Sequence, residues 1–207
     1  MNVLLINGSP HPKGCTYTAL RTVADQLEKN GLNTRILQMG NKAVRGCIAC
    51  GKCADTGHCV FTDDPVNEAI DLLREADALV VGSPVYYAGP NGSICAFLDR
   101  MFYMKSAPYA FKLAAAVVSC RRGGASASFD RLNKYFTIAR MPVVASQYWN
   151  SVHGNTPAEV LQDREGLQTM RTLGDNMAWL LKCIAAGKAA GVEYPTPEPW
   201  EATNFIR

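Results

Sequence analysis

Short apolar segments alternate with longer segments of helical periodicity along most of this chain. The predicted strands lie at 2–7, 33–39, 78–82, 113–119 and 142–146, and all of them except 33–39 are mainly apolar. Between them, apolar residues recur every three or four positions, which is typical of the buried face of a helix. Because parallel strands need a crossover connection, usually a helix, this alternation predicts a parallel sheet. Strands that are almost continuously apolar further indicate helices on both faces, and therefore a doubly wound α/β sandwich.

Capping signals mark several of the predicted helix ends. Gly31 follows the first helical segment, at a position where a left-handed residue commonly ends a helix. Asp64 and Pro65 supply a cap and a first-turn proline ahead of the next helix. The longest helical pattern, 167–184, is predicted to end at Gly187.

The length of the chain, 207 residues, suits one domain of ordinary size. We expect a single domain over 1–187, with a cysteine-rich, irregular insert at 40–63 inside it. The remaining residues, 188–207, are expected to form a C-terminal tail.

Composition and charge exclude several functional classes. The chain has 21 Lys and Arg against 18 Asp and Glu, and its net charge of +3 forms no basic stripe of the kind that nucleic-acid binding requires. The apolar segments fall far short of the roughly 18 residues that span a bilayer. None has the form of a signal-peptide core. We therefore expect a cytoplasmic protein with neither a membrane nor a nucleic-acid partner.

A loop rich in glycine and hydroxyl side chains joins the first predicted strand to the first helix. It runs from Gly8 to Thr18 and reads GSPHPKGCTYT. The free backbone amides and positive dipole end of a helix N-terminus bind phosphate well, and hydroxyl groups assist them. Lys13 stands where a Walker loop has its second glycine, and no GxGxxG pattern is present. The loop therefore favours a mononucleotide over ATP or a tightly bound dinucleotide, with an ordinary capped loop as the alternative.

Two further loops follow the third and fourth predicted strands. They read GSPVYYAGPNG from Gly82 to Gly92 and SCRRGG from Ser119 to Gly124. The aromatic rings and glycines of the first suit a flat heteroaromatic ring. The backbone amides and guanidinium groups of the second suit the polar edge of such a ring. Because ligands of these sheets bind outside the carboxyl ends of the strands, the three loops are expected to form one site.

Four cysteines within the insert have the spacing C-x2-C-x2-C-x5-C. They are Cys47, Cys50, Cys53 and Cys59. Three thiolates at this spacing can hold three corners of a cubane cluster, and a later cysteine can hold the fourth iron. Structural zinc sites more often pair two separate C-x2-C knuckles, although zinc accepts the same ligands. The spacing favours a [4Fe-4S] cluster, with zinc or metal-free thiols as alternatives.

Three motifs occur in the order typical of one known family. They are GSPHPKGCTYTAL, ADALVVGSPVYYAGPNGSICAFLDRMF and SCRRGG. With them, residues 1–187 resemble the flavodoxin-like NADPH-dependent FMN reductase family, including its iron-sulfur flavoprotein branch. The resemblance implies a flavodoxin-like, five-stranded parallel sheet in the order 2-1-3-4-5 with helices on both faces. The family often has asparagine where Cys15 stands.

The resemblance also implies cofactors and an assembly. It implies FMN, with its phosphate on the first loop and its isoalloxazine between the other two. The implied cofactor-binding residues are Ser9, His11, Lys13, Cys15, Thr16, Thr18, Pro84, Val85, Tyr86, Tyr87, Ser119, Arg121, Gly123 and Gly124. The compact cysteine motif implies a [4Fe-4S] cluster that passes electrons to FMN. A homodimer or homotetramer is expected, as is common in the family.

Three functions fit these features. In the first, an enzyme uses NADH or NADPH as a transient hydride donor to FMN and passes the electrons to a flavin, quinone or other small acceptor. In the second, FMN and cluster relay electrons between ferredoxin-like partners without a nicotinamide site. In the third, a binding module holds another phosphorylated ligand and uses its cysteines for zinc. We favour the first, and we assign no catalytic side chain because the cofactor performs the chemistry.

Overall fold

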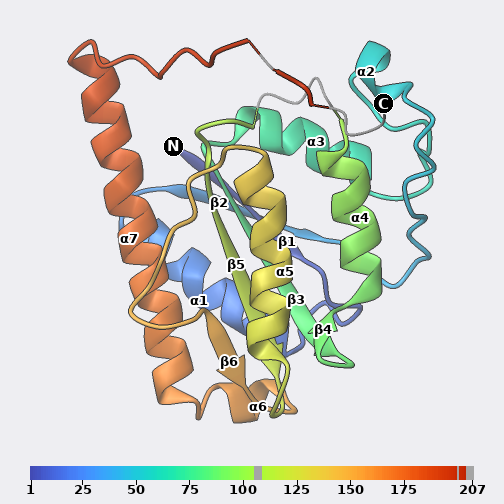
Figure 1. Cartoon of the computed structure of the whole chain (residues 1–207). Helices are drawn as coiled ribbons and strands as arrows, with labels where there is room; N and C mark the ends of the chain where they lie inside the picture. Colours follow the sequence, from blue (N-terminus) through green and yellow to red (C-terminus); the bar gives the residue numbers. More distant parts are fainter. Residues whose placement is uncertain (105–108, 200, 204–207) are drawn as a thin grey trace.

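Parallel strands form the central sheet of the computed structural model, which describes residues 1–104, 109–199 and 201–203 (Figure 1). The sheet has the order β2-β1-β3-β5-β6. The strand bounds are β1 (Asn2–Asn7), β2 (Asn33–Gln38), β3 (Ala78–Tyr86), β4 (Gly89–Pro90), β5 (Leu113–Cys120) and β6 (Ser151–His153). The short β4 pairs in antiparallel fashion with the end of β3. The parallel strands therefore confirm the flavodoxin-like order 2-1-3-4-5, and β4 is an addition that the apolar pattern does not predict.

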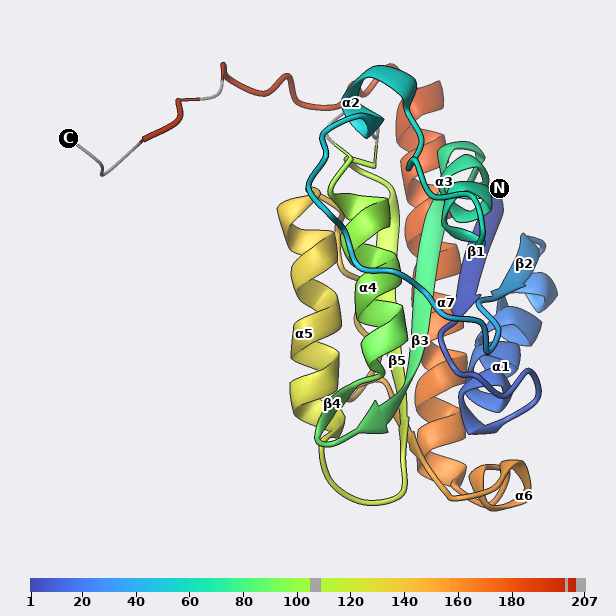
Figure 2. The same ribbon diagram turned by 90° about the vertical axis from the view of Figure 1, so that its right-hand side faces the viewer.

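Helices cover both faces of this sheet, as Figure 2 shows for α4 and α5 on one side and α1 and α7 on the other. The helix bounds are α1 (Cys15–Lys29), α2 (Cys53–Thr56), α3 (Val66–Glu75), α4 (Gly92–Phe102), α5 (Ala125–Ile138), α6 (Pro157–Val160) and α7 (Arg164–Ala189). Within the described residues, none of these helices combines the length and apolarity that a bilayer crossing needs.

Alternate residues of each central strand belong to two separate cores. In β1, Leu4 and Ile6 pack under α3, α4 and α5, whereas Val3 and Leu5 pack under α1 and α7. Successive side chains of a strand point to opposite faces, so a strand that is buried on both sides must be apolar throughout. This is the physical reason why the apolar runs predicted the first strands correctly.

The last strand lies later in the chain than predicted. The predicted segment, 142–146, forms only an isolated bridge between Val143 and Ala114 among the described residues. After this bridge the chain leaves β5, and it pairs with the end of β5 again at β6. The return depends on the buried Asn150, whose Nδ2 donates to the Ala116 carbonyl at 3.0 Å. A search for apolar runs does not detect a strand that begins beside a buried polar residue.

The helix ends agree with the predictions in part. Gly31 has φ +85° and lies just past the C-cap residue of α1, Asn30, as a left-handed residue that ends the helix. The prediction for α7 is wrong, because the helix continues past Gly187 to Ala189. The left-handed residue there is Gly191, and the Val192 amide bonds back to the Gly187 carbonyl at 2.9 Å. Gly187 is thus the carbonyl acceptor of the capping motif and remains helical.

The carboxyl end of β1 meets the middle of β3 at two glycines, beside the start of α4. The Gly8 amide donates to the Gly82 carbonyl at 2.9 Å. A Cβ atom at Gly8 would lie 2.7 Å from that carbonyl oxygen and 2.8 Å from the Ile94 side chain. The close approach fixes the start of the loop after β1 against β3 and the first turn of α4.

We predict that Gly8→Ala destabilises the fold. The new methyl group would push β1 away from a backbone oxygen that cannot rotate aside, at a cost of about 1 to 3 kcal/mol. Gly92→Ala is the matched control, because nothing lies within 4 Å of its added Cβ. Denaturant unfolding measures both variants, and equal stabilities of the two would contradict this account.

Candidate functional site

The three predicted loops surround one cleft at the carboxyl ends of β1, β3 and β5. The cleft has a volume of about 600 Å³, within the range usual for small-molecule sites. The predicted residues that line it are Ser9, His11, Lys13, Cys15, Thr16, Pro84, Val85, Tyr86, Ser119 and Arg121. The structure therefore brings residues from three distant parts of the chain around one cavity.

The N-terminus of α1 opens into this cleft without a side-chain cap. Its N-cap residue, Gly14, has no side chain that could bond the first turn, and the first turn contains no acidic residue. The amides of that turn thus face the cleft with no internal partner and with the positive end of the helix dipole. This arrangement fits a phosphate group.

Hydroxyl groups lie beside this helix end. Thr16 Oγ1 and Ser119 Oγ are 2.8 Å apart, and both residues are buried. Ser9 Oγ accepts a hydrogen bond from the His11 amide at 3.1 Å, which holds the first loop in a tight turn. The hydroxyls of α1 and β5 therefore meet at the floor of the cleft.

Some predicted contacts lie outside the lining of the cleft. Thr18 donates its hydroxyl to the Gly14 carbonyl at 3.2 Å. Tyr87 is fully exposed at the tip of the β3–β4 hairpin, where Tyr87 and Ala88 both have positive φ angles, 49° and 60°. Gly124, with φ +95°, packs so closely under this tip that a Cβ atom would lie 2.6 Å from Ala88 Cα. Together with Gly123, these residues shape the loops around the cleft and do not line it.

The sequence analysis missed a fourth loop that lines the cleft. The further lining residues are Gly14, Cys120, Gly154, Asn155, Thr156 and Pro157. The last four follow β6, so the misplacement of the fifth strand hid the loop at its carboxyl end. A signal was available, because Thr156 caps α6 ahead of a proline at its first turn.

Cys15 lies between the first and the fourth loop. Its thiol donates to the Gly154 carbonyl with a sulfur–oxygen distance of 3.7 Å. Burial raises the pKa of this thiol, the backbone at the start of α1 opposes the shift, and the negative charge of Glu159 adds to it. Cys15 is thus a neutral thiol near neutral pH, which is compatible with an anion bound nearby.

The four cysteines of the insert line a second, smaller cavity, which we call the cysteine pocket. Cys47 and Cys50 are exposed, whereas Cys53 and Cys59 are half-buried against the core under α3 and α4. Arg100 also lines this cavity. Burial raises the pKa of the Cys53 thiol, and the negative charges of the other three cysteines raise it further. The structure therefore places the four predicted cysteines around one cavity.

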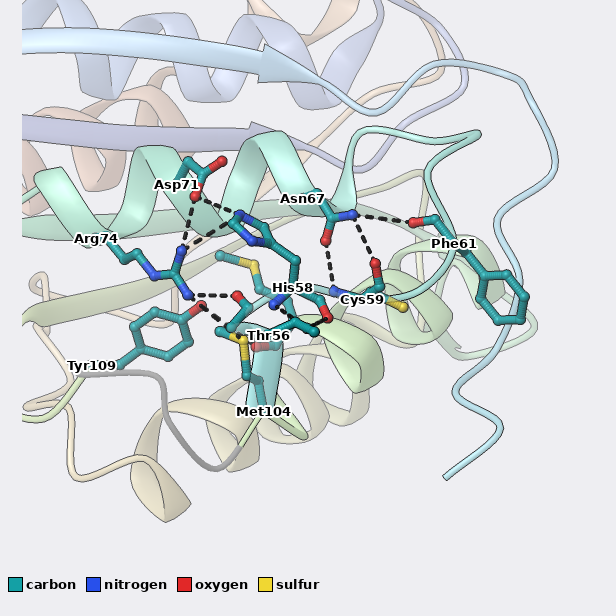
Figure 3. Close-up of polar contacts among 11 residues, drawn as sticks. Thr56, His58, Cys59, Phe61, Asn67, Asp71, Arg74, Met104 and Tyr109 are labelled. Carbon is teal, nitrogen blue, oxygen red and sulfur yellow. Dashed lines mark hydrogen bonds and ion pairs between the residues drawn. The ribbon is translucent and has the colours of Figure 1, made fainter. Parts of the chain in front are cut away.

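Side chains of α3 hold the segment that carries Cys59, as Figure 3 shows. Asn67 accepts from the Cys59 amide at 2.8 Å and donates to the Cys59 carbonyl at 3.0 Å. Asp71 lies 2.8 Å from His58 Nε2, and Arg74 donates to Asp71 at 2.9 Å. His58 is thus engaged with α3 and not with the cysteine sulfurs in the described contacts.

As its side chains stand, the cysteine pocket fits neither a single metal ion nor a cluster. Over the described residues, no three Cys, His, Asp or Glu side chains are placed to hold one metal ion. A zinc ion at 2.3 Å from each sulfur would bring the thiolates to about 3.8 Å from one another. The cavity has a volume of about 20 Å³, room for about one water molecule. A cluster would fit only if the exposed segment with Cys47 and Cys50 moved outward.

Elements of the two sites lie at opposite ends of α4: Figure 2 shows α2 of the insert beside one end and β4, which follows β3, beside the other. The helix starts at Gly92, beside the loop after β3, where Asn91 caps it by accepting from the Ser93 amide at 2.7 Å. Its 11 residues span about 16 Å. Near its other end, Arg100 reaches into the cysteine pocket. One helix therefore connects the two sites.

Comparisons with known proteins agree with this geometry. The family model described as NADPH-dependent FMN reductase matches residues 1–156. An iron-sulfur flavoprotein of Methanocaldococcus jannaschii is 31% identical over 89% of this chain and 99% of its own length. The iron-sulfur flavoprotein of Methanosarcina thermophila is 27% identical over 89% and 97%.

Solved structures show the same fold at low sequence identity. A flavodoxin from the domain Archaea has a TM-score of 0.60 at 15% identity, covering 88% of this chain and 99% of the other. The NAD(P)H:quinone oxidoreductase from Methanothermobacter marburgensis has a TM-score of 0.65 at 16% identity, covering 86% and 96%. These likenesses establish a flavodoxin-like fold.

Proposed function

The chain belongs to the NADPH-dependent FMN reductase family, in its iron-sulfur flavoprotein branch, and from this premise we propose how it works as a flavin oxidoreductase. FMN binds in the cleft at the carboxyl ends of β1, β3 and β5. The observation that carries this proposal is the uncapped N-terminus of α1, which opens into the same cleft as the aromatic loop after β3.

The proposed phosphate site consists of the first turn of α1 and the loop before it. The hydroxyls of Ser9 and Thr16, the thiol of Cys15 and the side chains of His11 and Lys13 surround the phosphate. Thr18 supports this loop through its bond to the Gly14 carbonyl.

The proposed isoalloxazine site lies between the loops after β3 and β5. Pro84, Val85 and Tyr86 contact the ring from one side, and Ser119 and Arg121 meet its polar edge. The positions of Tyr87, Gly123 and Gly124 suggest that they keep these two loops in shape.

Bound FMN supplies hydride acceptance and single-electron transfer, which no side chain of the chain provides. The residues of the cleft bind and orient the ring, and the apolar side chains of its loops limit the access of water. We assign no acid or base among them.

We propose that Cys47, Cys50, Cys53 and Cys59 hold a [4Fe-4S] cluster. The common cavity that the four side chains line supports this assignment, as do the names of the relatives. A zinc ion and four metal-free thiols are the alternatives to the cluster. The iron and zinc content per chain distinguishes the three states.

We propose NADH or NADPH as a transient electron donor and a flavin, quinone or other small molecule as the acceptor. The alternative is an electron carrier fed by a ferredoxin-like donor. The separate cysteine pocket favours this alternative, because a simple nicotinamide-dependent reductase needs no second redox site. In either case we expect a homodimer or a homotetramer.

Anaerobic titration of the purified protein distinguishes the two proposals. If the protein is a reductase, NADH or NADPH bleaches the flavin absorbance within seconds, faster than reduced ferredoxin does. If it is a carrier, reduced ferredoxin bleaches the flavin rapidly and both nicotinamides are slow. A colourless protein that binds no FMN would contradict both.

We predict that Thr16→Val weakens FMN binding about tenfold, equivalent to about 1.4 kcal/mol. The substitution keeps the shape of the side chain, but it removes a hydroxyl from the phosphate site and leaves Ser119 without its partner. Thr22→Val is the control, because the Thr22 hydroxyl bonds the Thr18 carbonyl, away from the cleft. Fluorescence titration of the apoprotein with FMN measures both, and equal affinities would place the phosphate elsewhere.

We predict that Cys50→Ser removes iron and leaves FMN bound. The wild-type protein should contain about four iron atoms per chain after anaerobic reconstitution. Serine is a poor ligand for iron, whereas the FMN cleft lies at the far end of α4. Cys183→Ser is the matched control, since Cys183 is an exposed cysteine of α7. Full iron content in Cys50→Ser would overturn the cysteine assignment.

A further inference from the structure

Two amide side chains meet at the carboxyl ends of β1 and β2, beside the loop that follows β1. Asn7 is the last residue of β1 and is completely buried, and Gln38 is the last residue of β2 and is half-buried. The parallel register places the two residues opposite each other, and Asn7 Nδ2 donates to Gln38 Oε1 at 2.5 Å. Neither residue belongs to the lining of the cleft. Their effect on the cleft must therefore pass through the loop.

The amide pair bonds the main chain of this loop. Asn7 Oδ1 accepts from the Ser9 amide at 3.2 Å, and Gln38 Nε2 donates to the Ser9 carbonyl at 2.7 Å. Asn7 Nδ2 also lies 3.5 Å from the His11 carbonyl oxygen, which accepts from the Gly14 amide at 3.3 Å. The carbonyls of Ser9 and His11 are thus both bonded to donors of the protein.

The sequence of the loop makes the direction of its carbonyls important. Pro10 and Pro12 have no N–H group, so residues 9–13 carry five carbonyls and only three amides. Two of the three amides already have partners within the protein. A carbonyl oxygen has a negative partial charge, and it would repel a phosphate group that it faced. A loop of this composition can border an anion only if its carbonyls are held away from it.

The hydroxyl of Ser9 is the group that this arrangement leaves for a ligand. Ser9 is buried and lines the cleft. Its oxygen accepts from the His11 amide at 3.1 Å, so the hydrogen of the hydroxyl is not used in that bond and can be donated to an acceptor in the cleft. Because Asn7 and Gln38 fix the amide and the carbonyl of Ser9, they also fix the position of its side chain.

We propose that Asn7 and Gln38 are positioning residues that make the cleft select FMN over riboflavin, the same flavin without its phosphate. The inference rests on the proposed FMN site. The amide pair holds the carbonyls of Ser9 and His11 away from the phosphate and keeps the Ser9 hydroxyl as a donor to it. Riboflavin has a neutral hydroxyl at the corresponding position, and a carbonyl can accept a hydrogen bond from that group. Riboflavin binding therefore does not depend on the pair.

Gln38→Met tests this selection directly. The variant keeps a side chain of similar length and removes both hydrogen bonds of the amide. We expect its affinity for FMN to fall about tenfold, because the freed Ser9 carbonyl can turn toward the phosphate. Its affinity for riboflavin should stay at the wild-type value. Fluorescence titration of the apoprotein with each flavin measures both affinities.

Arg35→Met is the matched control, since it places the same residue on the same strand. Arg35 forms an ion pair with Glu68 at 2.6 Å, and its side chain is 58% exposed. Neither residue lines the cleft, so the affinities for both flavins should be those of the wild type. Phosphorus-31 magnetic resonance of bound FMN adds a second readout. The phosphate resonance should shift in Gln38→Met and stay in place in Arg35→Met.

Gln38→Glu provides a second variant in case Gln38→Met does not fold. Its side chain still accepts from Asn7, but it presents a carboxylate to the Ser9 carbonyl where the wild type has a donor. We expect a loss of FMN affinity at least as large as in Gln38→Met, again with riboflavin affinity unchanged. Circular dichroism of each apoprotein identifies the variants that have folded.

The outcomes separate the inference from the function on which it rests. A loss confined to FMN in the Gln38 variants supports the inference. Equal losses for FMN and riboflavin, unchanged affinity for FMN, or a wild-type protein that binds the two flavins equally well would overturn it and leave the cleft as a flavin site. A wild-type protein that binds neither flavin overturns the proposed function and the inference together.

Discussion

The contact of backbone with backbone at Gly8 is the constraint on which the rest of the site depends. Here the amide that follows β1 bonds the Gly82 carbonyl in the middle of β3, and Ile94 in the first turn of α4 lies against Gly8. Because no side chain separates them, the start of the loop after β1 lies directly against the backbone of β3. The parallel register of β5 with β3 brings Ser119 level with Pro84, which adds the third loop. The cleft follows from this convergence.

The insert depends on side chains that belong to other elements. Within the described residues of 40–63, α2 is the only regular element, so most of the backbone groups there find no partner within the segment. Buried backbone groups need partners, and α3 and α4 provide them. Asn67 bonds the Cys59 main chain, Arg74 bonds the Gly57 carbonyl, and Arg100 bonds the Phe61 carbonyl. The cysteine pocket is thus built against helices whose other faces complete the core.

Much of the fold was predictable because it rests on local patterns. Strands buried on both faces must be apolar throughout, and this identified β1, β3 and β5. The same rule failed at β6, where Asn150 satisfies main-chain groups of β5 and interrupts the apolar pattern. Because the last strand was predicted too early in the chain, the loop at 154–157, which lines the cleft, was missed as well. Gly187 was misread for a related reason, since a capping glycine is defined by bonds to residues that follow it.

The sequence by itself determined the groups available to this protein: a loop rich in glycine and hydroxyl side chains, a loop with two tyrosines, and four cysteines in a compact spacing. These features are local, because spacing along the chain decides which groups share a turn or a helix end. Only the tertiary structure decided that the loop after β6 joins the cleft and that the cysteine pocket lies at the far end of α4. It alone placed Arg100 against Cys59, residues 41 positions apart. Contacts of this kind arise from packing across elements, and no periodicity in the sequence records them.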